Sequence, residues 1–394
     1  MIDYIFANRV KDLKGSAIRE IFKIIDQPDM ISFAAGSPAP EMFPAKELAE
    51  ISQEILLNNG AVALQYGITE GYAPLRNLVK ERMAKRNIGR KNDDCIIVSG
   101  GQQGIDLAAK VLLNEGDGVI CENPSFIGGL NSFRAYNAKL YGVNIEEDGL
   151  NIDELEQTLK ENSNIKLIYT IATFQNPSGI TMSLDKRKKL LELADKYNVY
   201  ILEDNPYGDL RFKGEDVPTI KSMDANGRVI YVGSFSKILS PGLRLGWVVA
   251  PAEIIQKVVV VKQVNDVHTN VFSQMLAAEY MKKYCIDEHI EKIRELYGRR
   301  CGFMLECMDQ YFPDYCTYTR PEGGLFIWCT LPEGIDTIEL SRKAVEKKVA
   351  FVPGSTCMVD QNKVCNSFRL NYSTMSEEKI EEGIKILGEV LKNI

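Results

Sequence analysis

The segment Ser234–Trp247 places one lysine, Lys237, between two serine hydroxyls, with Arg244 seven residues further on. A lysine becomes nucleophilic only when desolvation or nearby cations lower its pKa, and it then forms an imine with an aldehyde. The hydroxyls of Ser234 and Ser236 and the guanidinium of Arg244 can hold a phosphate. An aldehyde and a phosphate together indicate pyridoxal 5′-phosphate. A polar loop between two strands is the plainer interpretation of the same residues.

Two polar segments upstream would complete such a site. Asp204 ends an apolar run, and a carboxylate facing a pyridine nitrogen keeps that nitrogen protonated, so the ring accepts electrons. Asn176, after another apolar run, could donate a hydrogen bond to the ring oxygen, and Tyr207, three residues after Asp204, can reach the same oxygen. Each segment has an alternative reading. An acid at a strand end is often a helix cap or a metal ligand, and Asn-Pro and Ser-Gly are turn dipeptides.

Two further segments offer groups that bind anions. Ser99–Gly104 is rich in glycine, so backbone N–H groups near Gly101 and Gln102 can approach a phosphate at a helix N-terminus. The spacing matches neither a Walker loop nor a dinucleotide fingerprint, so a turn without a ligand is equally compatible. Arg369 lies in an apolar strand, where it suits an α-carboxylate or, alternatively, a structural ion pair.

Alternating strand-like and helix-like segments position these residues between about residues 70 and 250. The apolar runs expected as strands are 96–99, 118–121, 166–172, 199–203, 229–233 and 246–249. The segments expected as helices between them are 102–113 and 183–197. This alternation predicts an α/β domain with a mainly parallel sheet, in which ligands bind at the carboxyl ends of the strands. The residues with candidate chemistry follow these strand ends.

After about residue 283 the pattern changes and predicts a smaller α+β domain. Residues 1–45 are expected to pack on this small domain and cover the site, 46–283 to form the large cofactor-binding domain, and 284–394 to form the small one. Expected helices there are 288–308, 337–348 and 377–391, and expected strands are 324–331 and 367–371. The apolar run 254–264 is expected to be a buried helix, and the basic run 186–189 a solvated helix face.

Composition limits the class of protein. The 394 residues carry a formal net charge of −7, which argues against a nucleic-acid-binding surface. The sequence shows neither a run of about 18 uncharged apolar residues nor a secretory signal pattern, so no membrane span or export is expected. Nine cysteines without a Cys-x-x-Cys pair, and only two histidines, disfavour a disulfide framework or a zinc site. They favour reduced thiols in the cytoplasm.

In this order the segments resemble the pyridoxal-phosphate-dependent aminotransferases of fold type I, class I/II, and most closely the 2-aminoadipate, kynurenine and aromatic aminotransferases. The likeness runs from about residue 15 to the C-terminus. Besides the Lys237 segment it includes Ser16–Ile21, Phe33–Pro40, Leu64–Gly67, Thr69–Arg76, Phe174–Pro177, Arg320–Gly324 and Phe351–Gly354. It implies an α/β architecture with a mainly parallel seven-stranded sheet in the large domain, plus the smaller α+β domain.

The resemblance implies a role for each matching residue. Lys237 would be the Schiff-base lysine, and Asp204 would face the pyridine nitrogen. Asn176 and Tyr207 would contact the ring oxygen. Phe126 stands where a tyrosine usually stacks on the ring, which keeps the stacking face and removes the hydroxyl. The residues around the phosphate would be Gly101, Gln102, Ser234, Ser236 and Arg244, joined by Tyr66 from the neighbouring subunit of a homodimer with shared sites.

The resemblance also implies substrate contacts. Arg369, Asn176 and the backbone near Gly36 would hold the α-carboxylate. Ser16 and Arg19 are candidates in the N-terminal segment. An arginine at the position of Arg19 can read the distal carboxylate in 2-aminoadipate enzymes, whereas in others of the group this helix moves to admit apolar or aromatic side chains. Arg19 therefore favours a dicarboxylic substrate without establishing one.

The implied reaction is a ping-pong transamination. An L-amino acid of the 2-aminoadipate, aromatic or branched-chain or aliphatic type would pass its amino group to a 2-oxo acid, with 2-oxoglutarate the expected acceptor. Lys237 would move the Cα proton. A β-lyase or decarboxylase of the same fold stays an alternative, because a fold does not fix a reaction. The non-enzyme alternative is a DNA-binding regulator, which needs an added basic domain that the acidic chain does not favour.

Overall fold

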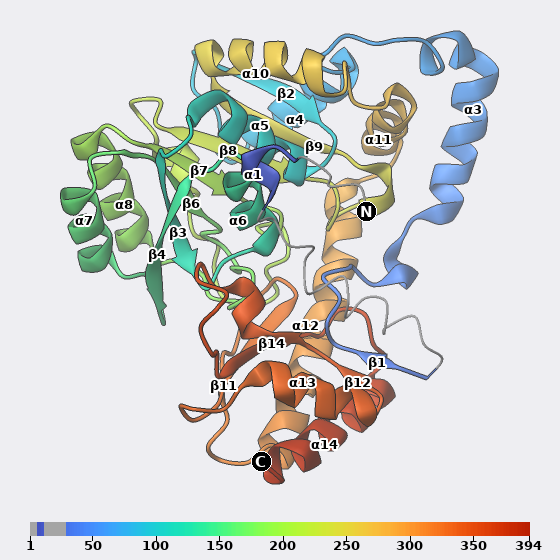
Figure 1. The fold of residues 1–394 in the computed structure, drawn as a ribbon. Helices are drawn as coiled ribbons and strands as arrows, with labels where there is room; N and C mark the ends of the chain where they lie inside the picture. The colour runs from blue at the N-terminus through green and yellow to red at the C-terminus, as the bar shows by residue number, and fades with distance from the viewer. Residues whose placement is uncertain (1–5, 12–28) are drawn as a thin grey trace, which may run out of the picture.

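The computed structural model describes residues 6–11 and 29–394, and an eight-stranded sheet forms the centre of its larger part (Figure 1). In order across the sheet, the strands are β2 (Asp93–Val98), β9 (Gly246–Pro251), β8 (Val229–Ser234), β7 (Tyr200–Asp204), β6 (Ile165–Thr170), β3 (Gly118–Asn123), β4 (Lys139–Glu146) and β5 (Gly149–Leu150). The strands from β8 to β4 are parallel to their neighbours, whereas β9 runs antiparallel to β2 and β8.

The predicted α/β fold with a mainly parallel sheet is confirmed. The sheet has one strand more than the seven expected, because the chain turns back after β4 and adds the two-residue strand β5 in antiparallel pairing. β8 is buried at all of its positions, and β6 and β7 are each buried at all but one. Strands covered on both faces carry continuous apolar sequences rather than alternating ones, which is why these runs were recognisable.

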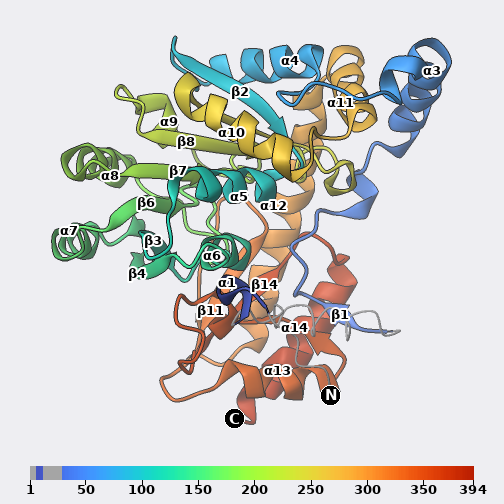
Figure 2. The same ribbon diagram turned by 45° about the horizontal axis from the view of Figure 1, so that its top comes forward.

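Helices cover this sheet on both sides. They are α4 (Ala73–Ala84), α5 (Gly101–Leu112), α6 (Ile127–Arg134), α7 (Ile152–Glu161), α8 (Leu184–Tyr197), α9 (Ile220–Met223), α10 (Ala252–Asn265) and α11 (Val271–Lys283). Figure 2 shows α5, α6 and α10 together in front of the sheet. The long helix α3 (Ala45–Ala63) packs on α11 at the edge of the molecule. No helix in the described part of the chain is both long and apolar enough to cross a membrane.

Two expectations about helix surfaces need correction. The run 254–264 is helical as predicted, but α10 is buried on one side only: Val260 and Val264 are 56% and 80% exposed. In α8 the basic run is not a wholly solvated face. Arg187 is fully buried there, because its guanidinium donates hydrogen bonds to the carbonyl oxygens of Ala172 (2.7 Å) and Met182 (2.9 Å).

A smaller, antiparallel sheet lies below the first in Figure 1. Its strands, in order, are β10 (Thr317–Tyr318), β11 (Phe326–Thr330), β14 (Ser367–Asn371) and β13 (Val352–Pro353). Beside it, β1 (Ile31–Ser32) pairs in parallel with β12 (Val349–Ala350). The helices of this part are α12 (Ile286–Tyr311), α13 (Thr337–Glu346) and α14 (Glu377–Lys392). The division of the chain at residues 45 and 283 stays a prediction.

Candidate active site

A cavity of about 500 Å³ opens where the carboxyl ends of β7 and β8 face the small sheet. Its lining comes from segments far apart in the sequence, because parallel strands bring their carboxyl ends to one edge of a sheet. Twelve of the predicted site residues line it: Gly36, Gly101, Gln102, Phe126, Asn176, Asp204, Tyr207, Ser234, Ser236, Lys237, Arg244 and Arg369. Arg369 reaches the cavity from β14, so the site lies between the two sheets.

Lys237 lies in the turn that follows β8, and its Nζ donates a 2.5 Å hydrogen bond to the carbonyl oxygen of Gly36. Burial, aided by the positive charges of Arg369 and Arg244, lowers the pKa of this amine to about 8 against the attraction of Asp204. Within the described residues no carboxylate forms an ion pair with Lys237. The lowered pKa makes the neutral amine, which a nucleophile or proton acceptor must be, far more accessible near physiological pH than it is for an ordinary lysine.

Asp204, the last residue of β7, is buried and lines the cavity. Its Oδ2 accepts a 3.0 Å hydrogen bond from the hydroxyl of Tyr169. Burial raises the pKa of Asp204 to about 7, although this hydrogen bond opposes the rise. The preceding acid, Glu203, instead accepts the backbone N–H groups of Ile220 and Lys221 at the start of α9. The helix-cap alternative for this acidic pair thus describes Glu203, and the cavity-facing acid is Asp204.

Asn176 and Tyr207 lie side by side on the cavity wall. The amide nitrogen of Asn176 is 3.5 Å from the hydroxyl of Tyr207, and both side chains are buried. Burial raises the pKa of the Tyr207 hydroxyl, so it stays protonated and can donate a hydrogen bond. Together they place two donors, an amide N–H and a phenol O–H, at one wall of the cavity.

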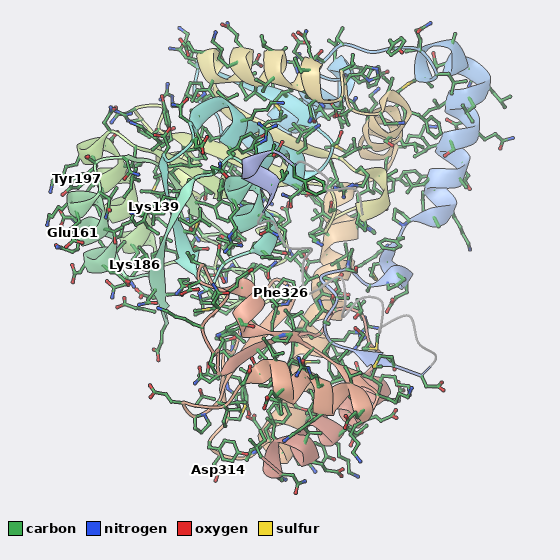
Figure 3. All side chains as sticks on the ribbon, viewed as in Figure 1. Lys139, Glu161, Lys186, Tyr197, Asp314 and Phe326 are labelled. Carbon is green, nitrogen blue, oxygen red and sulfur yellow. The ribbon has the colours of Figure 1, made fainter. Side chains whose placement is uncertain are left out.

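Arg369 is only 6% exposed, yet no carboxylate forms an ion pair with it in the described part of the chain. One terminal nitrogen donates to Oδ1 of Asn176 (2.8 Å) and the other to the carbonyl oxygen of Ala34 (2.7 Å). Its guanidinium lies 4.1 Å from the centre of the Phe326 ring, at the junction of the two parts of the molecule (Figure 3). Its Nε has no hydrogen-bond partner among the described residues. A buried cation without a counter-ion is costly, so an incoming anion would be favoured.

Hydroxyl, guanidinium and backbone groups gather at the N-terminus of α5. Ser234, Ser236 and Arg244 line the cavity beside Gly101, the first residue of that helix. Arg244 adopts a left-handed backbone conformation (φ 54°), and its guanidinium approaches the backbone at Gly100. Gly100 itself has φ 84°, and a Cβ there would lie 2.6 Å from a guanidinium nitrogen of Arg244. The positive φ favours glycine at this position, and the missing side chain leaves room for the guanidinium beside the start of α5.

The side chain of Gln102 is hydrogen-bonded within the protein. Its side-chain amide donates to the carbonyl oxygen of Gly128 (3.0 Å) and to the hydroxyl of Ser132 (2.8 Å). This part of the amide is already used inside the protein, so the backbone N–H of the helix start is the group left for an anion. Phe126, the N-cap residue of α6, lines the same wall, as the stacking role requires.

Among the described residues, one predicted site residue, Tyr66, does not line the cavity. Tyr66 is 81% exposed after the end of α3 and lies edge-on to His268. Ser16 and Arg19 lie outside the described residues.

Several cavity residues were missed by the sequence reasoning: Ile105, Ile127, Gly128, Ile171 and Pro206 line the wall, and Tyr169 and Ala34 bind residues that do. The sequence did offer a clue to Tyr169, because this tyrosine lies on the expected strand 166–172, seven residues before the predicted site residue Asn176.

The chemistry of this lining fits pyridoxal phosphate. A buried carboxylate suits a basic ring nitrogen, an amine of lowered pKa suits an aldehyde, and the cradle at α5 suits a phosphate. Among residues 6–11 and 29–394, no group of three or more histidine, cysteine or acidic side chains is arranged to hold a metal ion.

Comparison with known proteins agrees with this chemistry. The chain is 45% identical, over 98% of its length and 94% of the relative's, to aromatic-amino-acid aminotransferase 1 of Thermococcus litoralis. Its fold is similar to the multiple substrate aminotransferase of Thermococcus profundus, with a TM-score of 0.94, 43% identity and coverage of 98% and 97% of the two chains.

A third similar protein carries a derivative of the cofactor in its crystal structure. It is an α-aminoadipate aminotransferase from Thermus thermophilus, complexed with N-(5′-phosphopyridoxyl)-L-leucine, with a TM-score of 0.90, 38% identity and coverage of 98% and 97%. Residues 28–387 match the family described as aminotransferase class I and II. The chain belongs to this family and is a pyridoxal-phosphate-dependent aminotransferase.

Proposed function

We propose that Lys237 is the catalytic lysine, that Asp204 binds the ring nitrogen of the cofactor, and that Arg369 binds the substrate α-carboxylate. Pyridoxal phosphate, when bound, supplies an aldehyde that takes up the amino group and a ring that accepts electrons. One observation carries the proposal. Lys237 and Arg369 share one cavity, and neither has a carboxylate ion-pair partner among the described residues. An amino acid supplies the missing anion and presents its Cα hydrogen to a base.

Lys237 moves the proton of the substrate's Cα. Because its pKa is lowered to about 8, Nζ can take up this proton near neutral pH and deliver it again. The 2.5 Å hydrogen bond to the Gly36 carbonyl oxygen holds Nζ in the cavity. The same carbonyl belongs to the segment that faces Arg369, so the base and the carboxylate anchor lie in one continuous pocket.

Arg369 orients the substrate. Its terminal nitrogens are fixed by Asn176 and by the carbonyl oxygen of Ala34, and the ring of Phe326 supports the guanidinium plane. A planar guanidinium held in this way binds a carboxylate in one orientation, which a flexible lysine ammonium would not do. This fixes the Cα hydrogen relative to Lys237 Nζ.

The remaining polar residues hold the cofactor. Ser234, Ser236, Arg244 and the start of α5 at Gly101 bind the phosphate. All of them line the cavity, and a Cβ built on Gly101 would lie 3.8 Å from the Cβ of Ser234. Asn176 and Tyr207 donate to the ring oxygen, and Phe126 stacks on the ring. Gln102 takes part through its backbone N–H.

The substrate class follows from the charges that remain. Once the phosphate occupies Arg244 and the α-carboxylate occupies Arg369, no further cation except Lys237 lines the cavity within the described residues. Apolar walls at Phe126, Ile127 and Ile171 suit an aromatic or aliphatic side chain. We therefore infer aromatic and aliphatic L-amino acids as donors, with 2-aminoadipate as a further donor and 2-oxoglutarate as the acceptor. Arg19 binds the distal carboxylate of these last two.

The site is completed by a second copy of the chain. Large apolar side chains are exposed on α3 and the segment after it, namely Leu56, Leu57, Val62, Leu64, Tyr66 and Ile68. Neighbouring exposed apolar residues of this kind mark protein–protein interfaces. We infer a cytoplasmic homodimer in which Tyr66 reaches the phosphate of the partner's cofactor.

Half-reactions test the substrate class. The loaded enzyme is mixed with single amino acids, without acceptor, and the cofactor absorbance and the released 2-oxo acid are followed. Phenylalanine and leucine should each release one 2-oxo acid per site and stop, and 2-oxoglutarate should then restore the starting absorbance. Continuous release of pyruvate from a cysteine conjugate without acceptor would instead support a β-lyase.

The substitution Arg19→Ala tests whether Arg19 binds only those substrates that have a distal carboxylate. Loss of a distal-carboxylate contact should raise the Michaelis constant for the acceptor, 2-oxoglutarate, by about tenfold or more. The Michaelis constant for phenylalanine should change by less than about twofold, because phenylalanine has no distal carboxylate. The dicarboxylate alone loses a charge-assisted hydrogen bond, which contributes about 1.5–3 kcal/mol. Arg9→Ala removes another N-terminal arginine and serves as the matched control. An equal rise for both substrates would contradict the role of Arg19.

A further inference from the structure

Tyr169 lies on β6, beside the strand that ends at Asp204. It is fully buried, and its hydroxyl donates a 3.0 Å hydrogen bond to Oδ2 of Asp204. Burial raises the pKa of this tyrosine well above its usual range, so the hydroxyl keeps its proton and acts as the donor. The bond therefore has one direction, from the tyrosine to the carboxylate.

The ring of Tyr169 is held in place by helix α6. Phe133 packs against it edge-on, with the ring centres 5.3 Å apart. On the same helix, a Cβ at Gly129 would lie 2.7 Å from the ring carbons and 2.9 Å from the hydroxyl oxygen of Tyr169. The glycine leaves room for the ring, and the phenylalanine fixes its orientation. The hydroxyl is thus positioned before any ligand binds.

The hydrogen bond from Tyr169 makes the two carboxylate oxygens of Asp204 different. Oδ2 is used by Tyr169, whereas no hydrogen bond to Oδ1 is present among the described residues. Oδ1 lies 3.9 Å from the position of a Cβ built on Gly101, a residue that lines the cavity. One oxygen is anchored on the protein side, and the other stays available to a ligand.

We propose that Tyr169 is a positioning residue for the pyridine nitrogen of the cofactor: by holding Oδ2 of Asp204, it presents Oδ1 to the ring N–H. This inference rests on the proposed role of Asp204. Electrostatics agree with the geometry. Burial raises the pKa of Asp204 and the nearby Glu122 charge raises it further, while the Tyr169 hydrogen bond and the charge of Lys237 lower it. The tyrosine favours the ionised carboxylate that a protonated ring nitrogen needs.

Cofactor affinity provides a test that is independent of turnover. Pyridoxamine 5′-phosphate, which binds without a bond to Lys237, is titrated into the cofactor-free full-length protein, alongside its analogue with carbon in place of the ring nitrogen. Tyr169→Phe should weaken binding of pyridoxamine phosphate by about tenfold, because it removes a hydrogen bond to a charged group, and should change the affinity for the analogue by less than about twofold. Retained affinity for the analogue shows that the variant site is folded.

Tyr136→Phe is the matched control, because Tyr136 donates a 3.2 Å hydrogen bond to another acid, Asp106, which does not line the cavity. It should leave both affinities unchanged. The inference is overturned if Tyr169→Phe weakens both ligands by the same factor, or neither. If the wild-type protein itself does not distinguish the two ligands, the role of Asp204 fails, and the inference fails with it. Discrimination that survives Tyr169→Phe refutes the role of Tyr169 alone.

Discussion

The cavity and a buried ion cluster at the amino ends of β2 and β8 differ in how their charged groups are paired. In the cluster, Nζ of Lys221 lies 2.9 Å from Oδ2 of Asp93 and 3.0 Å from Oδ2 of Asp224, and all three side chains are inaccessible to solvent. In the cavity, Lys237 donates to a carbonyl oxygen, and Arg369 has no anionic partner in the described part of the chain. In the cluster each charged group has an ionic partner, whereas the cavity has three cations, Arg244 among them, without one in the described part of the chain.

The acidic residues of the two regions, like the cations, differ in how many partners they have inside the protein. Asp224 accepts the backbone N–H groups of Gly227, Arg228 and Val229, and with Lys221 these hold its pKa below the usual range despite burial. Asp204 has one hydrogen-bonded oxygen, and burial raises its pKa to about 7. Both oxygens of Asp224 thus have hydrogen-bond partners inside the protein, whereas Asp204, which lines the cavity, has Oδ1 without one among the described residues and carries a raised pKa.

The strongest test of this contrast is removal of the cavity lysine. Lys237→Ala should lower turnover by about 10⁴-fold or more, because it removes both the nucleophile and the group that moves the Cα proton. The free energy of unfolding of the cofactor-free protein should not fall, since a desolvated cation without an ionic partner is lost. Steady-state assays and urea unfolding measure the two effects. Near-normal turnover would refute the assignment of Lys237.

Removing the lysine of the cluster should have the reverse effect. Lys221→Met removes the ammonium that both buried carboxylates contact, so the free energy of unfolding should fall by about 3–5 kcal/mol. The turnover number per folded, cofactor-loaded site should stay within about twofold of wild type. Urea unfolding and active-site titration measure this. If the variant kept its stability and lost turnover, Lys221 would have a role in catalysis, and the contrast between the two regions would be wrong.

Removing the second cation of the cavity tests the anchor. Arg369→Lys keeps the charge and loses the planar fork, so kcat/KM for phenylalanine should fall by about 10²-fold, through KM as well as kcat. The affinity for pyridoxamine phosphate, which has no α-carboxylate, is the control and should change by less than about twofold. If kcat/KM for phenylalanine and the affinity for pyridoxamine phosphate fell by the same factor, Arg369 would have a structural role instead.

A smaller effect is expected from pH. The folded-state pKa of Lys237 is about 8, below its ordinary value of 10.5, so the cofactor-free fold binds fewer protons than the unfolded chain between these values. Its stability therefore rises with pH through this window, and the penalty for burying the charge is complete below pH 8. Lys237→Met should be more stable than wild type near pH 7, and the difference should shrink from pH 8 to 10.5. If the difference in stability between Lys237→Met and wild type did not change with pH, Lys237 would not be desolvated in the folded protein.

Much of this arrangement could be predicted from the sequence, because buried parallel strands have a distinctive pattern. The apolar runs that became β6, β7 and β8 are continuous, and the polar residues after them had to meet at one edge. Arg369 was recognisable because a charged residue interrupts an apolar strand. Within the described residues, the cavity brings together every predicted site residue except Tyr66.

What could not be predicted depends on tertiary contacts. Arg187 looks like a surface residue in sequence, and its carbonyl partners come from the loops around β6. The exposed side of α10 at Val264 differs from its buried side only through the neighbours it packs on. Whether Gln102 faces a ligand or Gly128 is decided by the position of α6. Strand β5 is too short to carry a pattern of its own.

The most direct test of the central claim is to locate the lysine that binds the cofactor. The protein is loaded with one equivalent of pyridoxal phosphate per chain, reduced with borohydride, and mapped by peptide mass spectrometry. The contrast between the two regions predicts one phosphopyridoxyl group on the peptide that contains Lys237 and none on Lys221 or Lys262, which are held by carboxylates. A label on another lysine, with Lys237 unmodified, would contradict it.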